Sequence, residues 1–338
     1  MKAAYIENHG GPEVLKIGEI NEPEIREGEV KVKVKACSLN HLDIWVRRGL
    51  PNLKIQFPHI LGSDIAGVIE EIKDENTYFK KNDKVILYPA TFCGYCEKCI
   101  SGKENFCKEY KILGENVKGG NAEYIVVKKE LLMPYPSNLS FEEAACLPLT
   151  LLTAMQMVKK SKIKPFQTAL VMAAGSGVSV MLIQILKALN CYVVAGSSSD
   201  DKLKKAKELG ADEIINYTDK DWEKKLKGKK IDVIFDHIGK DFLFSLLRIS
   251  KWGGKIITCG ATSGFDTSID LRYIFFKQIS LIGSTMGARK HLLQGINLLN
   301  SGKIKPVIDR VLPLEKIKDA HILLEEKKVF GKIVLKVD

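Results

Sequence analysis

The feature that most constrains this chain is a series of short apolar runs between residues 168 and 283, which alternate with segments of helical length. Residues 168–174 form the first run, and residues 178–189 have the length and composition of a buried helix. Further strand-like runs follow at 192–195, 214–215, 233–235, 256–259 and 279–283, with a charged helical segment at 202–209. Apolar strands alternating with helices predict an α/β domain with a doubly wound parallel sheet of six strands, covered on both faces.

The first part of the chain has a different pattern. Residues 29–36 alternate between apolar and charged side chains, which is the period of a half-buried strand. Other short β-branched runs lie at 15–20, 65–72, 83–88 and 123–127, separated by Gly, Pro and Asn. A last strand-like run lies at 332–337. We expect a β-rich domain over 1–146 and 287–338, and the parallel-sheet domain over 147–286.

The charge and composition of the chain limit the kinds of partner that it is expected to bind. Lys and Arg number 52 and Asp and Glu number 41, which gives a formal charge of +11. Many lysines lie close to acids, as in 202–208, and this favours a solvated surface over an anionic partner. No zinc-finger, RNA-recognition or helix-turn-helix signature supports nucleic-acid binding, which stays the weaker alternative. There is no run of ~18 apolar residues and no signal-peptide pattern, so we expect a cytoplasmic protein without a membrane partner.

Four of the eight cysteines are clustered: Cys93, Cys96, Cys99 and Cys107. Four thiolates at these spacings can complete a tetrahedral Zn²⁺ shell, which leaves no open position for a substrate. We therefore expect one structural zinc per chain, in a lobe over 91–110. That segment has few large apolar residues, so the metal would supply its folding energy. Free thiols or two disulfides are the alternative.

The turn after the first strand of the parallel sheet resembles a phosphate-binding turn. The dinucleotide fingerprint G-x-G-x-x-G requires small residues between a strand and a helix. Here the three fingerprint positions are Ala174, Ser176 and Ser179, while Gly175 and Gly177 let the backbone approach a diphosphate, and Val178 continues into the helix. The helix N-terminus would supply amide donors and a positive dipole end. An ordinary strand–helix turn of small residues is the alternative.

The end of the second strand bears on which dinucleotide binds. NAD enzymes place an acid there for the ribose 2′-hydroxyl, but the corresponding position is Ser197. Lys202 and Tyr217 could flank an adenosine phosphate, which a carboxylate would repel. We therefore expect NADP(H), with NAD(H) as the alternative because Asp200 and Asp201 are close in sequence.

Together these residues resemble the medium-chain dehydrogenase/reductase superfamily of zinc alcohol dehydrogenases and quinone oxidoreductases. The resemblance covers the whole chain and includes GGPEVL (10–15), LNHLD (39–43), RG (48–49), GSDIAG (62–67), LTLLTA (149–154), GST (283–285) and GKIVL (331–335). It implies a GroES-like catalytic domain, a Rossmann domain, a cleft between them, and a homodimer or homotetramer. It also implies cofactor contacts from His237, Gly260, Ser284 and Lys332.

The chain departs from zinc alcohol dehydrogenases at the catalytic metal. The positions of the three expected ligands hold Asn40, Ser63 and Cys146, so only one typical ligand is left. A second zinc would need an unusual set drawn from His41, Asp43, His59, Asp64 and Cys146. A lone histidine such as His41 is as often structural as it is a ligand.

These departures predict an NADPH-dependent reductase of quinones or enones, because conjugated acceptors need less help from a Lewis acid than plain ketones. Asn40 is the first candidate to donate a hydrogen bond to the substrate oxygen. Asp43, Ser63 and Thr150 are further candidates. The alternative is an alcohol dehydrogenase with an atypical metal site, acting on an alcohol or aldehyde.

Overall fold

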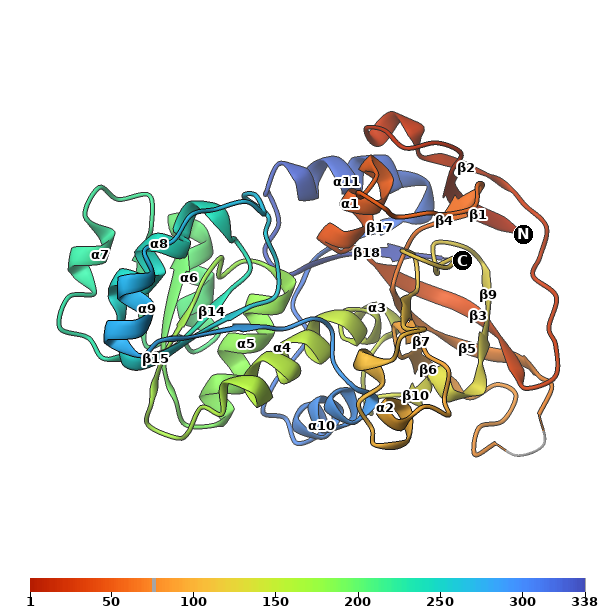
Figure 1. Cartoon of the computed structure of the whole chain (residues 1–338). Coiled ribbons are helices and arrows are strands. Elements are labelled where there is room, and N and C mark those ends of the chain that lie inside the picture. Colours follow the sequence, from red (N-terminus) through yellow and green to blue (C-terminus); the bar gives the residue numbers. More distant parts are fainter. Residues whose placement is uncertain (75–76, 338) are drawn as a thin grey trace. The chain divides into compact units, whose positions relative to one another are not determined.

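The computed structural model describes residues 1–74 and 77–337 and divides into two compact units. Unit 1 comprises Met1–Leu149, Ala288–Ile296 and the chain from Pro306 onward, and unit 2 comprises Thr150–Gly287 and Asn297–Lys305. One division therefore falls inside helix α10 (Arg289–Asn300). The sequence pattern predicted the domain boundaries at 146/147 and 286/287. Figure 1 labels the helices and strands that make up the two units.

A seven-stranded sheet organises unit 1, with the strand order β10-β6-β5-β3-β18-β17 and with β9 also paired to β3. A three-stranded sheet, β2-β1-β4, and the pair β7-β8 complete its strands. The bounds are β1 Lys2–Ile6, β2 Lys16–Glu19, β3 Glu29–Ser38, β4 His59–Ile60, β5 Asp64–Ile72, β6 Lys84–Leu87, β7 Ala90–Thr91, β8 Lys111–Ile112, β9 Tyr124–Lys128, β10 Leu132–Pro134, β17 Ile308–Pro313 and β18 Lys332–Lys336.

The alternation predicted for residues 29–36 is present in β3, where every second side chain is buried. Val30, Val32 and Val34 enter the core of unit 1 together with Ile69 from β5 and Leu335 from β18. The last strand thus lies inside the sheet: it is antiparallel to β3 and parallel to β17. Residues from the two ends of the sequence therefore share one core.

Short helices flank these sheets: α1 His41–Arg48, α2 Glu97–Ile100, α3 Phe141–Ala145 and α11 Ile317–Glu325. A fully buried guanidinium, that of Arg47, joins α1 to α11. Its Nη1 lies 3.1 Å from His321 Nδ1, and its Nη2 forms an ion pair with Glu325. Burial, and then the Arg47 charge, lower the pKa of His321 to about 3. His321 is therefore neutral and accepts the hydrogen bond.

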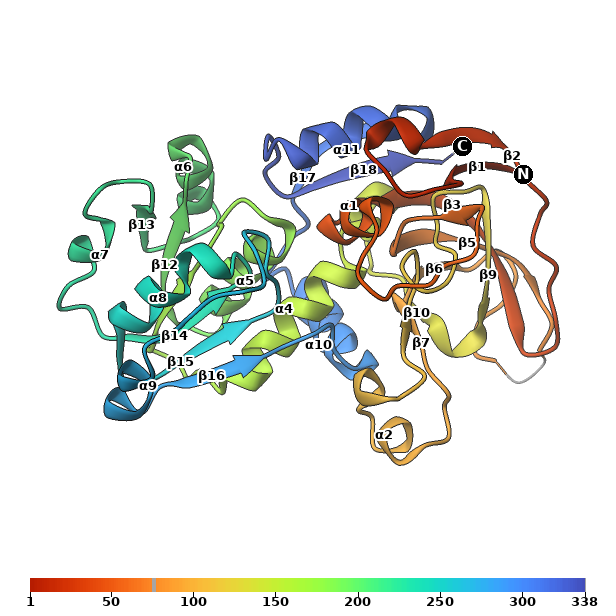
Figure 2. The same cartoon turned by 45° about the horizontal axis from the view of Figure 1, so that its top comes forward.

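Unit 2 contains the predicted sheet, which Figure 2 shows with its parallel strands. The order is β13-β12-β11-β14-β15-β16, so the chain reverses direction across the sheet between β11 and β14. The strands are β11 Thr168–Val171, β12 Tyr192–Ser197, β13 Glu213–Asn216, β14 Ile231–Asp236, β15 Ser250–Thr258 and β16 Ser280–Gly283. This reversal is the place where open α/β sheets bind ligands, beyond the carboxyl ends of the strands.

Both faces of this sheet are buried, as its apolar strands predicted. Leu170 and Ile234 belong to one core cluster, which also includes Trp222 and Leu246 from helices, while the alternate residue Val171 is equally buried. The helices of the unit are α4 Pro148–Ser161, α5 Gly177–Ala188, α6 Asp200–Glu208, α7 Trp222–Lys225, α8 Lys240–Ile249 and α9 Leu271–Lys277. Within the described chain, no helix is long and apolar enough to cross a bilayer.

Candidate functional site

The four clustered cysteines lie on a loop that β7 and β8 close at its base. The sulfur of Cys99 is 3.8 Å from that of Cys93 and 3.5 Å from that of Cys96, and the sulfurs of Cys107 and Cys93 are 3.6 Å apart. A tetrahedral zinc with Zn–S bonds of about 2.3 Å needs sulfurs about 3.8 Å apart, so the four side chains fit this ion. Among residues 1–74 and 77–337, they are the one group placed to hold a metal.

The loop around these cysteines has little core of its own. Tyr95, Ile100 and Phe106 are all more than half exposed. The sulfurs instead accept bonds from the backbone, with the amides of Cys96 and Glu109 each donating over 3.4 Å. Amides that point at sulfur stabilise thiolates, which is what a closed structural metal site requires.

A second polar cluster in unit 1 surrounds the start of α1. Asn40 is the residue before this helix, and its backbone amide donates to Asp43 Oδ2 over 2.7 Å. The other oxygen, Asp43 Oδ1, accepts from the Gly62 amide over 2.9 Å. Burial raises the pKa of Asp43 to about 6, against the opposing effect of these amide bonds. Both oxygens of Asp43 therefore hold the backbone segments that carry residues 40 and 63.

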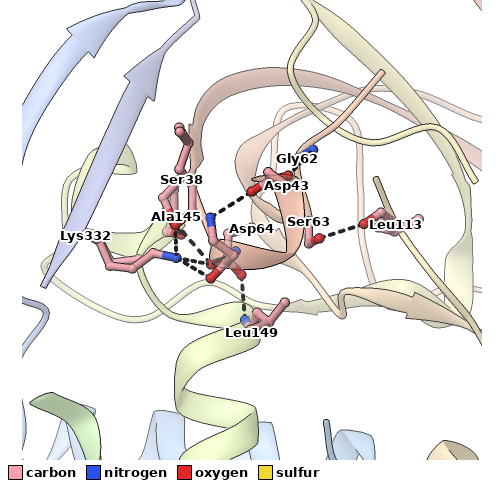
Figure 3. A network of polar contacts seen from close by, with 12 residues as sticks. Ser38, Asp43, Gly62, Ser63, Asp64, Leu113, Ala145, Leu149 and Lys332 are labelled. Atoms are coloured by element: carbon pink, nitrogen blue, oxygen red, sulfur yellow. Dashed lines mark hydrogen bonds and ion pairs between the residues drawn. The ribbon is translucent and has the colours of Figure 1, made fainter. Parts of the chain in front are cut away.

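Figure 3 shows that Lys332 and Asp64 form the centre of this cluster. Lys332 Nζ lies 2.8 Å from Asp64 Oδ2, 2.6 Å from Asn40 Oδ1 and 2.6 Å from the Leu39 carbonyl oxygen. Asn40 Nδ2 donates to Asp64 Oδ2 over 3.0 Å. Ser38 Oγ lies 3.2 Å from the same oxygen and 2.8 Å from the Ala145 carbonyl oxygen, and these two acceptors share its single proton. Lys332 and Asp64 are almost completely buried, so this is an internal ion pair.

The remaining side chains around the cluster are also bonded. Ser63 Oγ donates to the Leu113 carbonyl oxygen over 2.7 Å, and the Leu149 amide, in the first turn of α4, donates to Asp64 Oδ1 over 2.5 Å. Cys146 Sγ donates to a backbone carbonyl, and His59 Nε2 lies 3.1 Å from the carbonyl oxygen of Gly114. Asn40, Asp43 and Ser63 are thus held by hydrogen bonds within unit 1 and present no open set of ligand atoms, whereas the fourth candidate, Thr150, is a buried residue at the start of unit 2.

The phosphate-turn residues lie at the reversal point of the sheet in unit 2. Ser176 caps α5, because its Oγ accepts from the Ser179 amide over 3.1 Å. The Ala174 amide donates to the Gly196 carbonyl oxygen over 2.8 Å, which fixes the turn against the end of β12. His237, just after β14, places Nε2 2.9 Å from the hydroxyl oxygens of both serines. A capped helix N-terminus on the carboxyl side of a parallel sheet can bind an anion.

Comparison with known proteins decides the family. Residues 26–137 match the alcohol dehydrogenase GroES-like domain, and residues 177–301 match the zinc-binding dehydrogenase domain. An alcohol dehydrogenase of Geobacillus stearothermophilus is 33% identical over 342 residues, with all of both chains covered. The chain is a medium-chain dehydrogenase/reductase.

Two further relatives of this dehydrogenase/reductase are informative. The crystal structure of an NAD-dependent alcohol dehydrogenase superposes with a TM-score of 0.96 at 45% identity, and covers all of both chains. A quinone oxidoreductase of Mus musculus is 28% identical over 335 residues, which are 95% of this chain and 93% of the mouse protein. The predicted superfamily, the two fold types and the NAD(P)-dependent oxidoreductase class are confirmed.

The residues of this dehydrogenase/reductase fit a dinucleotide in unit 2. Ser284 Oγ is buried without a hydrogen-bond partner in the described chain, which leaves a polar atom for a ligand. A Cβ on Gly260 would lie 3.1 Å from the His237 carbonyl oxygen, a contact so tight that a larger residue would require the neighbouring backbone to shift. All the expected cofactor residues except Lys332 lie in this unit.

The cofactor contact expected of Lys332 stays a prediction. The resemblance implied a contact with the cofactor diphosphate, but the structure places this ammonium in unit 1 with three acceptors. An ammonium has three protons, so its donors are satisfied inside the protein. The signal that could have indicated this is Asp64, because a carboxylate in a buried strand requires a cation.

The positions that hold a catalytic zinc in zinc-dependent members of the superfamily do not fit that ion here. Asn40 offers an amide oxygen that already accepts from Lys332, and the Ser63 hydroxyl is bonded to Leu113. The carboxylate of Asp64 is neutralised by the same ammonium. Zinc prefers nitrogen and sulfur donors, of which this cluster has too few for a three-ligand catalytic site.

Proposed function

We propose that this enzyme is an NADPH-dependent reductase of quinones or enones that works without a catalytic metal. The observation that carries the proposal is the ion pair between Lys332 and Asp64, which includes Asn40 in a hydrogen-bonded network. The cofactor, when bound, supplies hydride. A conjugated acceptor spreads the resulting charge, so a hydrogen-bond donor can replace a Lewis acid.

Asn40 is the proposed donor. Its Oδ1 accepts from Lys332 Nζ, and this contact fixes the orientation of the amide, since an ammonium cannot face the NH₂ group. One Nδ2 proton is donated to Asp64, and the second is the one offered to a substrate oxygen. A cationic partner on the carbonyl side polarises the amide and strengthens its N–H as a donor. Lys332 therefore assists Asn40 rather than binding the diphosphate.

NADP(H) is the proposed dinucleotide. Ser197, at the end of β12, accepts from the Ser199 amide over 3.3 Å. The nearby Asp200 carboxylate accepts from Asn216 Nδ2 over 2.8 Å. A hydroxyl therefore occupies the position where NAD enzymes place an acid. Lys202 and Tyr217 are the proposed partners of the adenosine phosphate, although the 45% identical relative is named as NAD-dependent.

We also propose one structural zinc per chain on the four-cysteine loop, and assembly into a homodimer or homotetramer. Strand β16 lies at the edge of its sheet, and Leu281 on it is 41% exposed. Trp252 on β15 and Phe275 on α9 are also largely exposed. An edge strand with exposed apolar residues can pair with another copy of itself. If so, Leu281→Lys should lower the molar mass measured by light scattering.

The function is tested by oxidation of NADPH and NADH against a panel of quinones, enones, aldehydes and alcohols, with the metal content of the same sample measured. We expect quinone or enone reduction with NADPH and one zinc per chain. Turnover of simple alcohols together with two zinc ions per chain would overturn the proposal in favour of an atypical alcohol dehydrogenase.

The role of Asn40 is tested with Asn40→Ala and Asn40→Ser. Serine is favoured at a helix N-cap, so it preserves the start of α1 while removing the amide. Both variants should lower kcat about 100-fold, the usual effect of removing one oxyanion donor, with unchanged NADPH affinity. Ser38→Ala is the matched control, because the Ser38 hydroxyl also lies within hydrogen-bond distance of Asp64, and its other acceptor is the Ala145 carbonyl oxygen. An equal loss in Ser38→Ala would contradict a direct role for the amide.

A further inference from the structure

A histidine bridges the two serines that replace glycine in the dinucleotide turn. His237 Nε2 lies 2.9 Å from both Ser176 Oγ and Ser179 Oγ. Ser176 is the N-cap of α5, and Ser179 is fully buried in the first turn of that helix. All three residues belong to unit 2, so the arrangement does not depend on the other unit.

The protons in this arrangement can be assigned from its donors and acceptors. Ser179 Oγ donates its single proton to the Met172 carbonyl oxygen over 2.7 Å. Toward His237, Ser179 can therefore only accept, which requires a proton on Nε2. The imidazole is thus an N–H donor shared between the two hydroxyl oxygens.

This assignment determines what Ser176 can do. Its Oγ accepts from the Ser179 amide over 3.1 Å and from His237 Nε2–H over 2.9 Å. Both lone pairs are then used inside the protein. The hydroxyl proton of Ser176 has no acceptor among the described residues, so it remains for an acceptor outside the chain.

We propose that His237 is a positioning residue that makes Ser176 a hydrogen-bond donor to the diphosphate of the cofactor. The inference rests on the proposed placement of the dinucleotide at this turn. The helix N-terminus supplies amide donors there, and a hydroxyl held with its proton outward adds one further donor to an anion. Without His237, the hydroxyl could rotate and lose its fixed orientation.

The test is NADPH binding to the full-length enzyme, measured by calorimetry. A hydrogen bond to a charged group changes affinity by about 10-fold or more, so Ser176→Ala and His237→Phe should each weaken binding by about that factor. The double variant should lose no more than either single one, because both remove the same bond. His237→Gln should recover the affinity, since its amide can donate at the position of Nε2. The KM for NADPH should rise in the single variants while kcat at saturation stays constant.

Two further variants separate the possible failures. Ser140 caps α3 in unit 1, and its Oγ accepts from the Glu143 amide over 3.2 Å. Ser140→Ala therefore reproduces the loss of a serine cap and should leave NADPH affinity unchanged. Ser176→Asp retains the cap but places a carboxylate at the turn, so it should weaken binding more than 100-fold if the diphosphate lies there.

The outcomes are distinct. Normal binding by Ser176→Asp would show that the proposed cofactor turn is wrong. If Ser176→Asp binds poorly while His237→Phe binds normally, only the role of His237 is overturned. If the double variant loses the product of the two single effects, His237 contacts the cofactor independently, which also overturns the inference. The quinone and alcohol panel tests the proposed reaction separately, because binding requires no substrate.

Discussion

Unit 1 contains two places where the superfamily can hold a metal, and they use opposite chemistry. The loop at Cys93 to Cys107 presents four sulfurs within 4.8 Å of one another and almost no apolar core. The cluster around Asn40 has an internal ion pair within a network of hydrogen bonds in a packed unit. The comparison teaches that the four-cysteine loop needs a metal cation because it has almost no apolar core. The Asn40 cluster lies in a packed unit and obtains its positive charge from the side chain of Lys332.

The largest expected difference between the two places is in zinc content. Cys99→Ser combined with Cys107→Ser should lower zinc from about one per chain to nearly none and reduce the melting temperature by more than about 10 °C, since a structural zinc contributes on the order of 10 kcal/mol to folding. Atomic absorption and calorimetry measure both. Cys191→Ala, outside the loop, is the control and should retain zinc. Retention of a full equivalent by the double variant would show that the metal lies elsewhere.

The second largest effect is expected from breaking the ion pair between Lys332 and Asp64, which should lower the free energy of unfolding. Lys332→Met leaves Asp64 buried without its cation, and breaking such a pair costs about 3–5 kcal/mol, measurable by urea unfolding. Lys332→Met with Asp64→Asn should cost less, because no unpaired charge is left. Zinc content should stay the same in both. If the double variant lost the sum of the single losses, the pair would not behave as one unit.

The pH dependence of the free energy of unfolding should contain a contribution from Asp43 in the Asn40 cluster. Burial raises the pKa of Asp43 to about 6, above its unfolded value of about 3.9, so the folded state binds more protons between these values. Stability contributed by this group is therefore lost as the pH rises from about 4 to 6, by up to about 3 kcal/mol. Asp43→Asn should therefore remove this part of the decrease in the free energy of unfolding between about pH 4 and about pH 6.

Asp236 in unit 2 is the matched case, since burial also raises its pKa to about 6. Asp236→Asn should remove a similar part of the slope without affecting the cluster in unit 1. Urea unfolding at several pH values measures both effects. An unchanged slope in Asp43→Asn would mean that this carboxyl is ionised throughout the range.

The smallest expected effect concerns Ser63, which occupies a ligand position but donates its proton to the Leu113 carbonyl oxygen. Ser63→Ala should cost about 1 kcal/mol, the net value of one hydrogen bond, and should change kcat less than about twofold. A large fall in kcat with little loss of stability would instead make Ser63 a substrate contact.

Much of unit 2 could be predicted from the sequence, because buried parallel strands need uninterrupted apolar residues, which are easy to recognise. The run at 168–174 and the helix at 178–189 correspond to β11 and α5 within a few residues. The cysteine cluster could also be predicted, because its four residues lie close together in the sequence. Both patterns depend on residues that are close in the chain.

Other features depend on residues that are far apart, and local patterns do not reveal these. Helix α1 has only eight residues, and it buries the charged side chain of Arg47, whose partners His321 and Glu325 are more than 270 positions away. The partner of Asp64 is 268 positions away. The hydrogen bonds of His237 could not be predicted either, because the sequence shows two serines but not which acceptor each hydroxyl proton faces.

The position of β18 has a consequence for biosynthesis. This strand lies between β3 and β17, and it carries the ammonium that neutralises Asp64. During translation, β3 therefore lacks its neighbour β18, and Asp64 lacks its cation, until residues 332–336 have emerged from the ribosome. Unit 2 ends at Lys305, so chains in which residue 305 but not residue 332 has left the ribosome should hold a finished dinucleotide domain and an unfinished unit 1.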